Sequence, residues 1–423
     1  MACADLTPPA PGRLLVPMEV RWRRASNGIG GTLPAGFGTV WTTVALDLVG
    51  FGLVFPILPL YAQRFHASPT TIGLLVASFS VAQLALSPVW GRLSDRVGRK
   101  PVLVVSLVGT CVGGLLTGLA GSLWVLFLAR AVDGASGASV SVAQASVTDV
   151  AAPDQRARLL GLLGAAFGIG FVVGPALGSL AALGGPRVPF VLAGVIAGAN
   201  ALVATRRLPE THPIPERRPA RHGAVEWRRR GLPGLLVVAF LALVAFSAFE
   251  ATFSLLGQRR LGLGLASSAA VFTVIGLLIA LVQVGLVHPV VRRLGEGGAL
   301  RLGLVLDAVG LAVLADLHSF AVLALAVLAL TVGQGLVMPA LAAMVAGRVP
   351  ADRRGGVLGV QQAAGGLARV VGPVVGGATF AQLGPSAPYL VGAGLALLAV
   401  GVLAAQPDRA AGGGRPRQYI TLQ

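Results

Sequence analysis

Long apolar runs, separated by short polar or Gly- and Pro-rich breaks, occupy the chain from residue 40 to residue 405. Each run has about 20 residues, the length that an α-helix needs to cross the hydrocarbon core of a bilayer. The runs begin near Val40, Ile72, Val102, Leu123, Leu159, Val188, Leu235, Ala269, Leu302, Phe320, Val357 and Tyr389. The pattern predicts an all-α membrane protein with twelve transmembrane helices.

Composition agrees with a membrane protein. Apolar residues make up 55% of the 423 residues, and only 12% are charged. Soluble domains carry about 25% charged residues, which they need to cover their surface. The chain contains no nucleotide-binding loop, which argues against an ATP-driven pump.

The net charge of +17 is spread in a way that excludes a nucleic-acid-binding face. Tails and inner loops hold 27 of the 33 Arg and Lys residues, in seven separate segments, if the N-terminus lies inside. The outer loops hold Arg64, Arg187, Arg259 and Arg260. Because basic residues stay on the cytoplasmic side, we expect a multi-pass protein of the bacterial inner (plasma) membrane with both termini cytoplasmic.

The Arg- and Pro-rich segment near the middle of the chain divides the spans six and six. The expected organisation is a cytoplasmic tail (1–37), a six-helix bundle (38–206), a cytoplasmic linker (207–232), a second six-helix bundle (233–406) and a second tail (407–423). The basic leader before the first span is too long for a cleaved signal peptide. Met18 is an alternative start, and deletion of residues 1–17 should leave activity intact. Cys3 and Cys111 indicate neither a disulfide framework nor a metal site.

The two halves resemble each other. "VWGRLSDRVGRKPVL" follows the second span and "LVHPVVRRLGEGGAL" follows the eighth, which aligns Gly98 with Gly295. Likewise "GIGFVVGPALG" in span five aligns with "GLARVVGPVVG" in span eleven, and so Gly174-Pro175 with Gly372-Pro373. Duplicated six-helix halves are typical of secondary transporters, which bind substrate between the repeats.

The loop after span two combines glycines with an acid among cations. Gly91 and Gly98 allow close backbone approach and a sharp turn. Asp95 has four basic neighbours within reach, which are Arg92, Arg96, Arg99 and Lys100. One interpretation is a charge cluster with a role; the other is that the cations only signal topology and Asp95 offsets them.

Small residues recur through span five at Gly168, Gly170, Gly174, Pro175 and Gly178. Small residues at a spacing of four let helices approach closely, so generic packing is one interpretation. The recurrence of Gly-Pro at Gly372-Pro373 favours a specific role.

Ionisable residues inside the spans cost about 2.5–3.5 kcal/mol each at a helix centre. They are Asp47, Arg130, Asp133, Glu250, Asp307 and Arg369, with Asp316 near an outer edge. Arg130 and Asp133 are three residues apart, so they lie on one helix face and can pair. That pair is either structural or part of proton coupling.

Glu250 has no cation within two turns of its own helix, and it is the first candidate for binding a proton or a cation. The alternative is a structural hydrogen-bonding role. Asp47, early in span one, is a second candidate, or it caps or pairs locally. Asp307 is a third, or it pairs with an arginine of a loop.

Four segments carry a resemblance to a known family. "GRLSDRVGRKPVL" resembles the signature loop of the major facilitator superfamily, and "LARAVDGASGA" resembles its span-four motif. "GIGFVVGPALG" is similar to the span-five motif of its drug:proton antiporters, and "LDLVGFGLVFPILPLYAQRF" resembles span one of their tetracycline-efflux branch. The resemblance implies two pseudo-symmetric six-helix bundles.

The resemblance also implies roles for the residues. Asp95 would latch against the start of helix eleven, near Arg353–Gly355, in the outward-open state, and Asp149 would join this cytoplasmic gate. Gly170, Gly174, Pro175 and Gly178, with Gly372 and Pro373, would form the antiporter hinge that seals the halves. Arg130 would tune a nearby carboxylate in proton coupling.

The chain departs from the tetracycline branch at two positions. It has Gly113 where that branch has a span-three acid, and Ile279 near the place of a span-eight histidine. Both belong to the branch's drug and proton machinery, so tetracycline itself is not the expected substrate. Asp307 aligns with the branch's span-nine acid.

The expected function is proton-coupled export of small, amphiphilic organic molecules by alternating access. The proton is the coupling ion; we expect no cofactor, no metal, no enzymatic activity and no nucleic-acid partner, and a monomer in the bilayer. The alternatives are a carrier that imports or exchanges a nutrient or metabolite, and a membrane sensor or assembly factor that transports nothing.

Overall fold

The structure is a computed structural model, and it describes residues 33–406 apart from 35, 152–154, 212–230 and 350–353. Both expected tails up to residue 32 and from 407, Met18, most of the expected linker and Arg353 therefore lie outside the described residues. α8 ends at Arg207 and α9 begins at Leu232.

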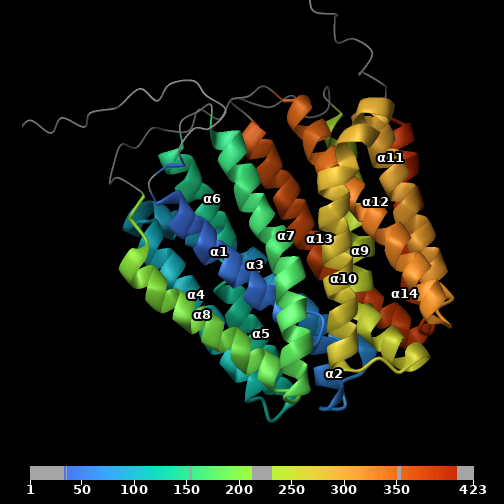
Figure 1. Cartoon of the computed structure of the whole chain (residues 1–423), viewed down its shortest axis with the longest axis horizontal. Coiled ribbons are helices and arrows are strands. Elements are labelled where there is room, and N and C mark those ends of the chain that lie inside the picture. The colour runs from blue at the N-terminus through green and yellow to red at the C-terminus, as the bar shows by residue number, and fades with distance from the viewer. Residues whose placement is uncertain (1–32, 35, 152–154, 212–230, 350–353, 407–423) are drawn as a thin grey trace, which may run out of the picture.

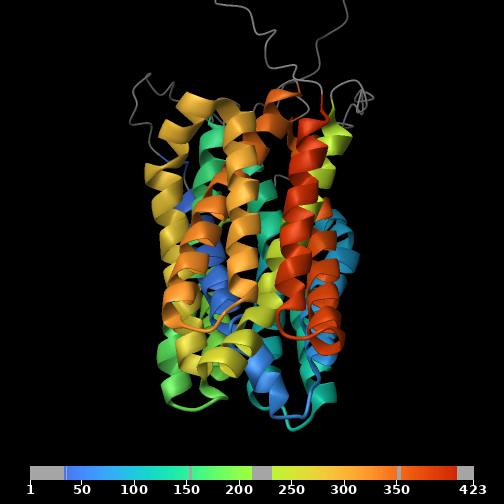
Figure 2. The same cartoon turned by 90° about the vertical axis from the view of Figure 1, so that its right-hand side faces the viewer.

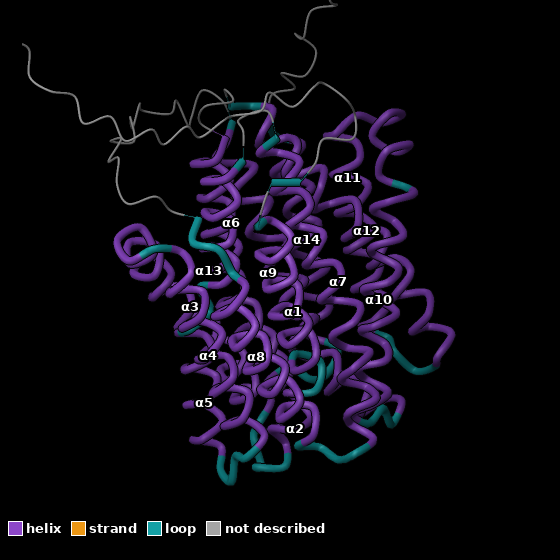
Figure 3. Tube along the Cα trace, turned by 60° about the vertical axis from the view of Figure 1, so that its left-hand side comes forward, coloured by secondary structure: helices purple, strands orange, loops and turns teal. Residues whose placement is uncertain are grey.

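The described residues form helices and no strands (Figure 3). The helices are α1 (Phe37–Val54), α2 (Leu58–Gln63), α3 (Pro69–Val97), α4 (Arg99–Gly118), α5 (Leu123–Ala135), α6 (Ser139–Val150), α7 (Arg156–Leu183), α8 (Val188–Arg207), α9 (Leu232–Leu261), α10 (Leu265–Gly285), α11 (Val287–Ala315), α12 (Phe320–Gly347), α13 (Arg354–Gln382) and α14 (Ala387–Ala404). Twelve segments are long and apolar enough to cross a membrane. The twelve-span prediction is confirmed: α5 and α6 form one span, and α2 is a short helix beyond α1.

Helix starts and turns repeat between the halves, as the sequence predicts. The side chains of Ser122 and Ser319, aligned by the repeat, accept hydrogen bonds from the backbone N–H groups of Val125 and Val322 at the starts of α5 and α12. Such caps satisfy donors that a helix start leaves open. Gly98 and Gly295 both have positive φ, 102° and 72°, a conformation that side-chain-bearing residues avoid.

The helices run side by side between two ends (Figure 2). α1 packs on α7 and α4 on α8 in the first half, and α9 packs on α13 and α11 on α12 in the second. The halves meet along two corresponding pairs, α3 with α13 and α7 with α10. The first pair is close enough that a Cβ at Gly73 would meet the carbonyl of Pro373, and one at Gly276 would meet that of Phe171 in the second.

We call the end of the molecule that carries Arg92, Arg96 and Lys100 the basic end, and the end that carries α2 the opposite end (Figure 1). A single apolar cluster spans both halves at the opposite end and includes Tyr61 and Phe253. Across it, Ser254 Oγ donates a hydrogen bond of 2.7 Å to the carbonyl of Pro56.

At the basic end the apolar residues form two further clusters, each built from one half alone. The first contains residues of α1, α4, α6, α7 and α8, and the second contains residues of α9 and α11–α14. The halves therefore share a core only toward the opposite end.

Candidate functional site

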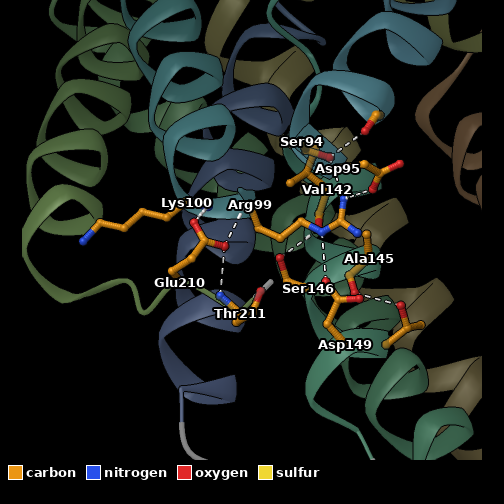
Figure 4. Close-up of polar contacts among 12 residues, drawn as sticks. Ser94, Asp95, Arg99, Lys100, Val142, Ala145, Ser146, Asp149, Glu210 and Thr211 are labelled. Atoms are coloured by element: carbon orange, nitrogen blue, oxygen red, sulfur yellow. Dashed lines mark hydrogen bonds and ion pairs between the residues drawn. The ribbon is translucent and has the colours of Figure 1, made fainter. Parts of the chain in front are cut away.

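Arg99 connects three polar groups at the basic end (Figure 4). Its side chain is 8% exposed, and its Nη1 lies 2.6 Å from Asp95 Oδ1. The same nitrogen donates to Ser94 Oγ at 2.6 Å, and Nε lies 2.9 Å from Asp149 Oδ2. Arg99 thus ties the end of α3 to the end of α6. The expected link between the signature loop and Asp149 is present in this geometry.

Glu210 belongs to this cluster, and sequence reasoning did not find it. Its carboxylate accepts hydrogen bonds from the backbone N–H groups of Arg99 at 2.8 Å and Lys100 at 3.1 Å (Figure 4). These groups form the N-terminus of α4, where an anion is stabilised by the helix dipole. A Cβ at Gly98 would lie 2.4 Å from Glu210 Oε2, so Gly98 provides the turn and also the space for this cap. The acid after an Arg-Arg pair at a helix end was the available signal.

Two expectations about this loop differ from the structure. Gly91 does not mark a turn or a close approach: it lies within α3, and no atom of the described residues lies within 4 Å of a Cβ there. The reason is that the halves share no core at this end. Asp95 contacts Arg99 rather than the start of α13; its expected contact concerned the outward-open state, and Arg353 lies outside the described residues. Arg96 is exposed.

The first half gathers three of the predicted in-span residues. Arg130 Nη1 lies 2.7 Å from Asp133 Oδ2, with side chains only 5% and 14% exposed. Asp47 is within electrostatic range of Asp133 and accepts a hydrogen bond of 2.5 Å from Ser139 Oγ. The guanidinium of Arg130 also stacks over the Phe79 ring, 4.4 Å from its centroid. The predicted Arg130–Asp133 pair is present, and Asp47 lies beside it.

Gly113 borders this group. A Cβ at Gly113 would lie 2.6 Å from the Cβ of Asp133. The missing side chain on α4 is what lets Asp133 of α5 occupy this place. Thus an acid is present next to position 113, although it is supplied by the neighbouring span.

Glu250 lies in the second half, 8% exposed, on α9. The sequence shows no cation within two turns of Glu250 on the same helix, but the fold brings Arg369 of α13 within electrostatic range. Arg369 is exposed, although it lies inside a span. Glu250 therefore has a cationic neighbour, and Arg369 is placed beside a candidate proton site, which its sequence context did not indicate.

Arg369 and Gln362 lie two helical turns apart on α13. Positions on one side of this stripe contact α9, where a Cβ at Gly365 would lie 3.2 Å from Leu243. Positions on the other side contact α3, where a Cβ at Gly366 would lie 3.2 Å from Leu84. The stripe of α13 that contains Gln362 and Arg369 therefore faces the region between α9 of the second half and α3 of the first.

Asp307 stands apart from both groups. It is 6% exposed, and its Oδ1 has no hydrogen-bond partner in the described part of the chain. It borders a small cavity between α9, α11, α12 and α14. The alternative of a pair with a loop arginine finds no support in the described residues, because the acid is enclosed within its own bundle.

The glycines of the expected hinge pack within each half. Cβ atoms at Gly174 and Gly178 would lie 2.7 Å from Gly52 Cα and 2.8 Å from the Leu53 carbonyl of α1. Gly170 and Pro175 contact the same helix. In the second half, Gly372 packs in the same way on α9. Of this set, Pro373 meets the other half in the described part of the chain, where its carbonyl lies against Gly73 of α3, whereas the glycine faces turn toward α1 and α9.

Comparisons with known proteins agree on one family. The model of the Major Facilitator Superfamily matches residues 40–315 and 289–420. The tetracycline resistance protein, class C, of Escherichia coli is 33% identical over 85% of this chain and 94% of its own length. Multidrug resistance protein 2 of Bacillus subtilis (strain 168) is 29% identical over 85% of this chain and 92% of its own.

Solved structures show the same fold. The crystal structure of the human organic anion transporter MFSD10 (TETRAN) is 26% identical, covers 87% of this chain and 98% of that chain, and has a TM-score of 0.67. The crystal structure of a peptide transporter, POT, is 15% identical, covers 90% of this chain and 95% of that chain, and has a TM-score of 0.74. Given the matching family model, the twelve spans and these relatives, the chain is a multi-pass membrane transporter of the Major Facilitator Superfamily, on the drug-exporter side that includes tetracycline and multidrug resistance proteins.

Proposed function

We propose that this protein exports small, amphiphilic organic molecules from the cytoplasm in exchange for protons, by alternating access. The observation that carries the proposal is the placement of acids inside the spans of both halves, half-buried in the first half and buried in the second. Asp47 and Asp133 lie in the first half, and Glu250 and Asp307 lie in the second. A buried carboxyl is expensive to keep in a span without a use, and proton-coupled transport uses such groups.

The proposed orientation places the basic end and both termini in the cytoplasm of the bacterial inner membrane. Arg and Lys residues of short loops remain on that side during insertion. The shared core at the opposite end then corresponds to the inward-facing state, in which substrate enters from the cytoplasm.

In the proposed cycle, a proton from outside neutralises an acid, and its release inside is exchanged for the substrate that leaves. Each charge that moves down the membrane potential supplies about 2.3 kcal/mol per 100 mV. Asp133 beside Gly113 serves in place of the acid that the tetracycline branch carries in span three, and Arg130 is its ion-pair partner. Asp95 leaves Arg99 to meet the start of α13 when the basic end closes.

Proton flux and drug resistance test this proposal together. In liposomes that contain the purified protein, the pH of the lumen should change only when substrate is added outside. A strain that overexpresses the protein should resist drugs to which a deletion strain is sensitive. Substrate-dependent transport without proton movement would reject the coupling.

The second candidate is transport of organic anions. It is favoured by the exposed Arg369 inside a span, because a cation at membrane depth is typically a site for a negative partner. One relative of similar fold is an organic anion transporter by its description. Support would come from a wild type that exports an anionic dye and an Arg369→Gln variant that does not, with the export of a neutral dye equal in both.

A further inference from the structure

The second half contains a pocket separate from the acids described above. It lies between α9, α12 and α13 and is lined by three glutamines, Gln334, Gln361 and Gln362, and otherwise by small and aliphatic residues. Among the residues that the structure describes, no charged side chain lines it. Its composition therefore suits an uncharged ligand.

Two of the three glutamines have a side-chain oxygen that accepts no hydrogen bond from the described residues. Gln334 is only 7% exposed, and its Oε1 has no partner in the described part of the chain. The Oε1 of Gln361 is buried in the same way without a partner. Buried amide oxygens are nearly always hydrogen-bonded, and an acceptor that is left without a donor is unfavourable. Two such acceptors in one pocket await donors that the described residues do not supply.

The third glutamine connects the pocket to the space between the halves. Gln362 is exposed, and it lies on the stripe of α13 that faces the region between α9 and α3. A molecule in that region therefore reaches the pocket past Gln362. Aliphatic residues such as Leu243 and Leu341 also line the pocket and favour an apolar body.

We propose that this pocket is a substrate subsite that binds an uncharged hydrogen-bond donor, a hydroxyl or amide N–H group, of an amphiphilic molecule. The donor bonds to the side-chain oxygen of Gln334 or of Gln361, and the apolar body packs on the aliphatic wall. The subsite deepens the proposed function, since it specifies one part of the exported molecule, but its binding requires neither a proton gradient nor turnover.

Binding of two matched probes tests the subsite. 2-Naphthol and 2-fluoronaphthalene have the same ring system and nearly the same size, but only the first donates a hydrogen bond. Both are titrated into the full-length protein in nanodiscs, with empty nanodiscs subtracted. We expect 2-naphthol to bind about 5-fold more tightly, as one net hydrogen bond allows. In Gln334→Leu/Gln361→Leu the preference should fall to about 1-fold.

Gln283→Leu is the matched control, because Gln283 is an exposed glutamine of α10 that does not line the pocket. It should keep the wild-type preference. Gly365→Ala adds a methyl group to the pocket wall and leaves the glutamines in place, so it should weaken both probes equally. It also replaces the double variant if that variant does not fold.

Three results would overturn the subsite: a wild type without preference for 2-naphthol, a preference that survives the double variant, or undiminished affinity in Gly365→Ala. Because no transport is measured, a protein without proton coupling can still pass this test, and a proton-coupled one can fail it.

Discussion

Glu250 shows how a single residue's role depends on a neighbour from another helix. No cation lies within two turns of it on α9, but Arg369 of α13 lies within electrostatic range of it. Glu250 could exchange a proton or bind a cationic substrate at this position. Replacement by glutamine, which is neutral, distinguishes these two roles from a structural one.

We expect Glu250→Gln to abolish uphill export and to preserve exchange and downhill leak, because the amide mimics the protonated acid. Drug-induced proton flux and dye efflux in proteoliposomes measure both. If Glu250 only forms hydrogen bonds, the change is nearly silent, since Gln keeps its shape. If it binds a cationic substrate, only cationic dyes are affected. Wild-type coupling in the variant would move the proton site to Asp47 or Asp307.

Glu210 acts as a cap on α4, and its removal should cost stability. We expect Glu210→Gln to lower the free energy of unfolding by about 1 kcal/mol, because the amide loses its favourable interaction with the helix N-terminus. Thermal unfolding in detergent measures this. Glu296→Gln changes an exposed acid of α11, at the position that the repeat aligns with Arg99, and is the control. Equal effects of the two changes would argue against the cap.

At the scale of the elements, glycine placement decides which helices approach. α7 carries Gly168 and Gly174 six residues apart, but they face different surroundings. A Cβ at Gly174 would lie 2.7 Å from the backbone of α1, whereas one at Gly168 would have no described atom within 4 Å outside the neighbouring backbone of its own helix. The glycine motif is therefore divided into positions that packing requires and positions that it does not.

We expect Gly174→Ala to destabilise the protein by about 1–3 kcal/mol, because the methyl group forces α1 and α7 apart. Gly168→Ala should be neutral or slightly stabilising, since alanine favours the helix. Thermal unfolding of the two variants, side by side, gives the comparison. A tolerated alanine at 174 would mean that the two helices separate without cost.

At the scale of the whole molecule, the two halves are joined at the opposite end and have separate cores at the basic end. The repeat supplies two equivalent contacts, α3 with α13 and α7 with α10, about which such halves can rock. Asp95 has no acidic counterpart before Gly295, so the repeat provides for only one such latch.

We expect Asp95→Asn to reduce turnover several-fold and to leave substrate affinity nearly unchanged. The acid biases the equilibrium between conformations and does not touch the proposed cavity. Transport rates and binding constants in proteoliposomes check the two parts separately. Unchanged rates would reject the latch, and a matching loss of affinity would place Asp95 in the binding site.

The sequence by itself determined the class of the protein, its twelve spans, the two related halves and the Arg130–Asp133 pair. Each of these depends on interactions that are local or periodic: apolar length, the distribution of basic residues, and spacing of three on one helix. Because the bilayer requires every span to be apolar and helical, these features can be recognised from the order of residues alone.

Only the tertiary structure decided which distant residues meet. Arg369 lies within electrostatic range of Glu250 from another helix, Glu210 caps α4 across 111 positions, Gly113 makes room for Asp133, and the glycines of α7 pack within their own half. Such contacts depend on helix rotation and tilt. In a uniformly apolar span the sequence fixes these only weakly, because lipid and neighbouring helices are almost equally good surroundings for most side chains.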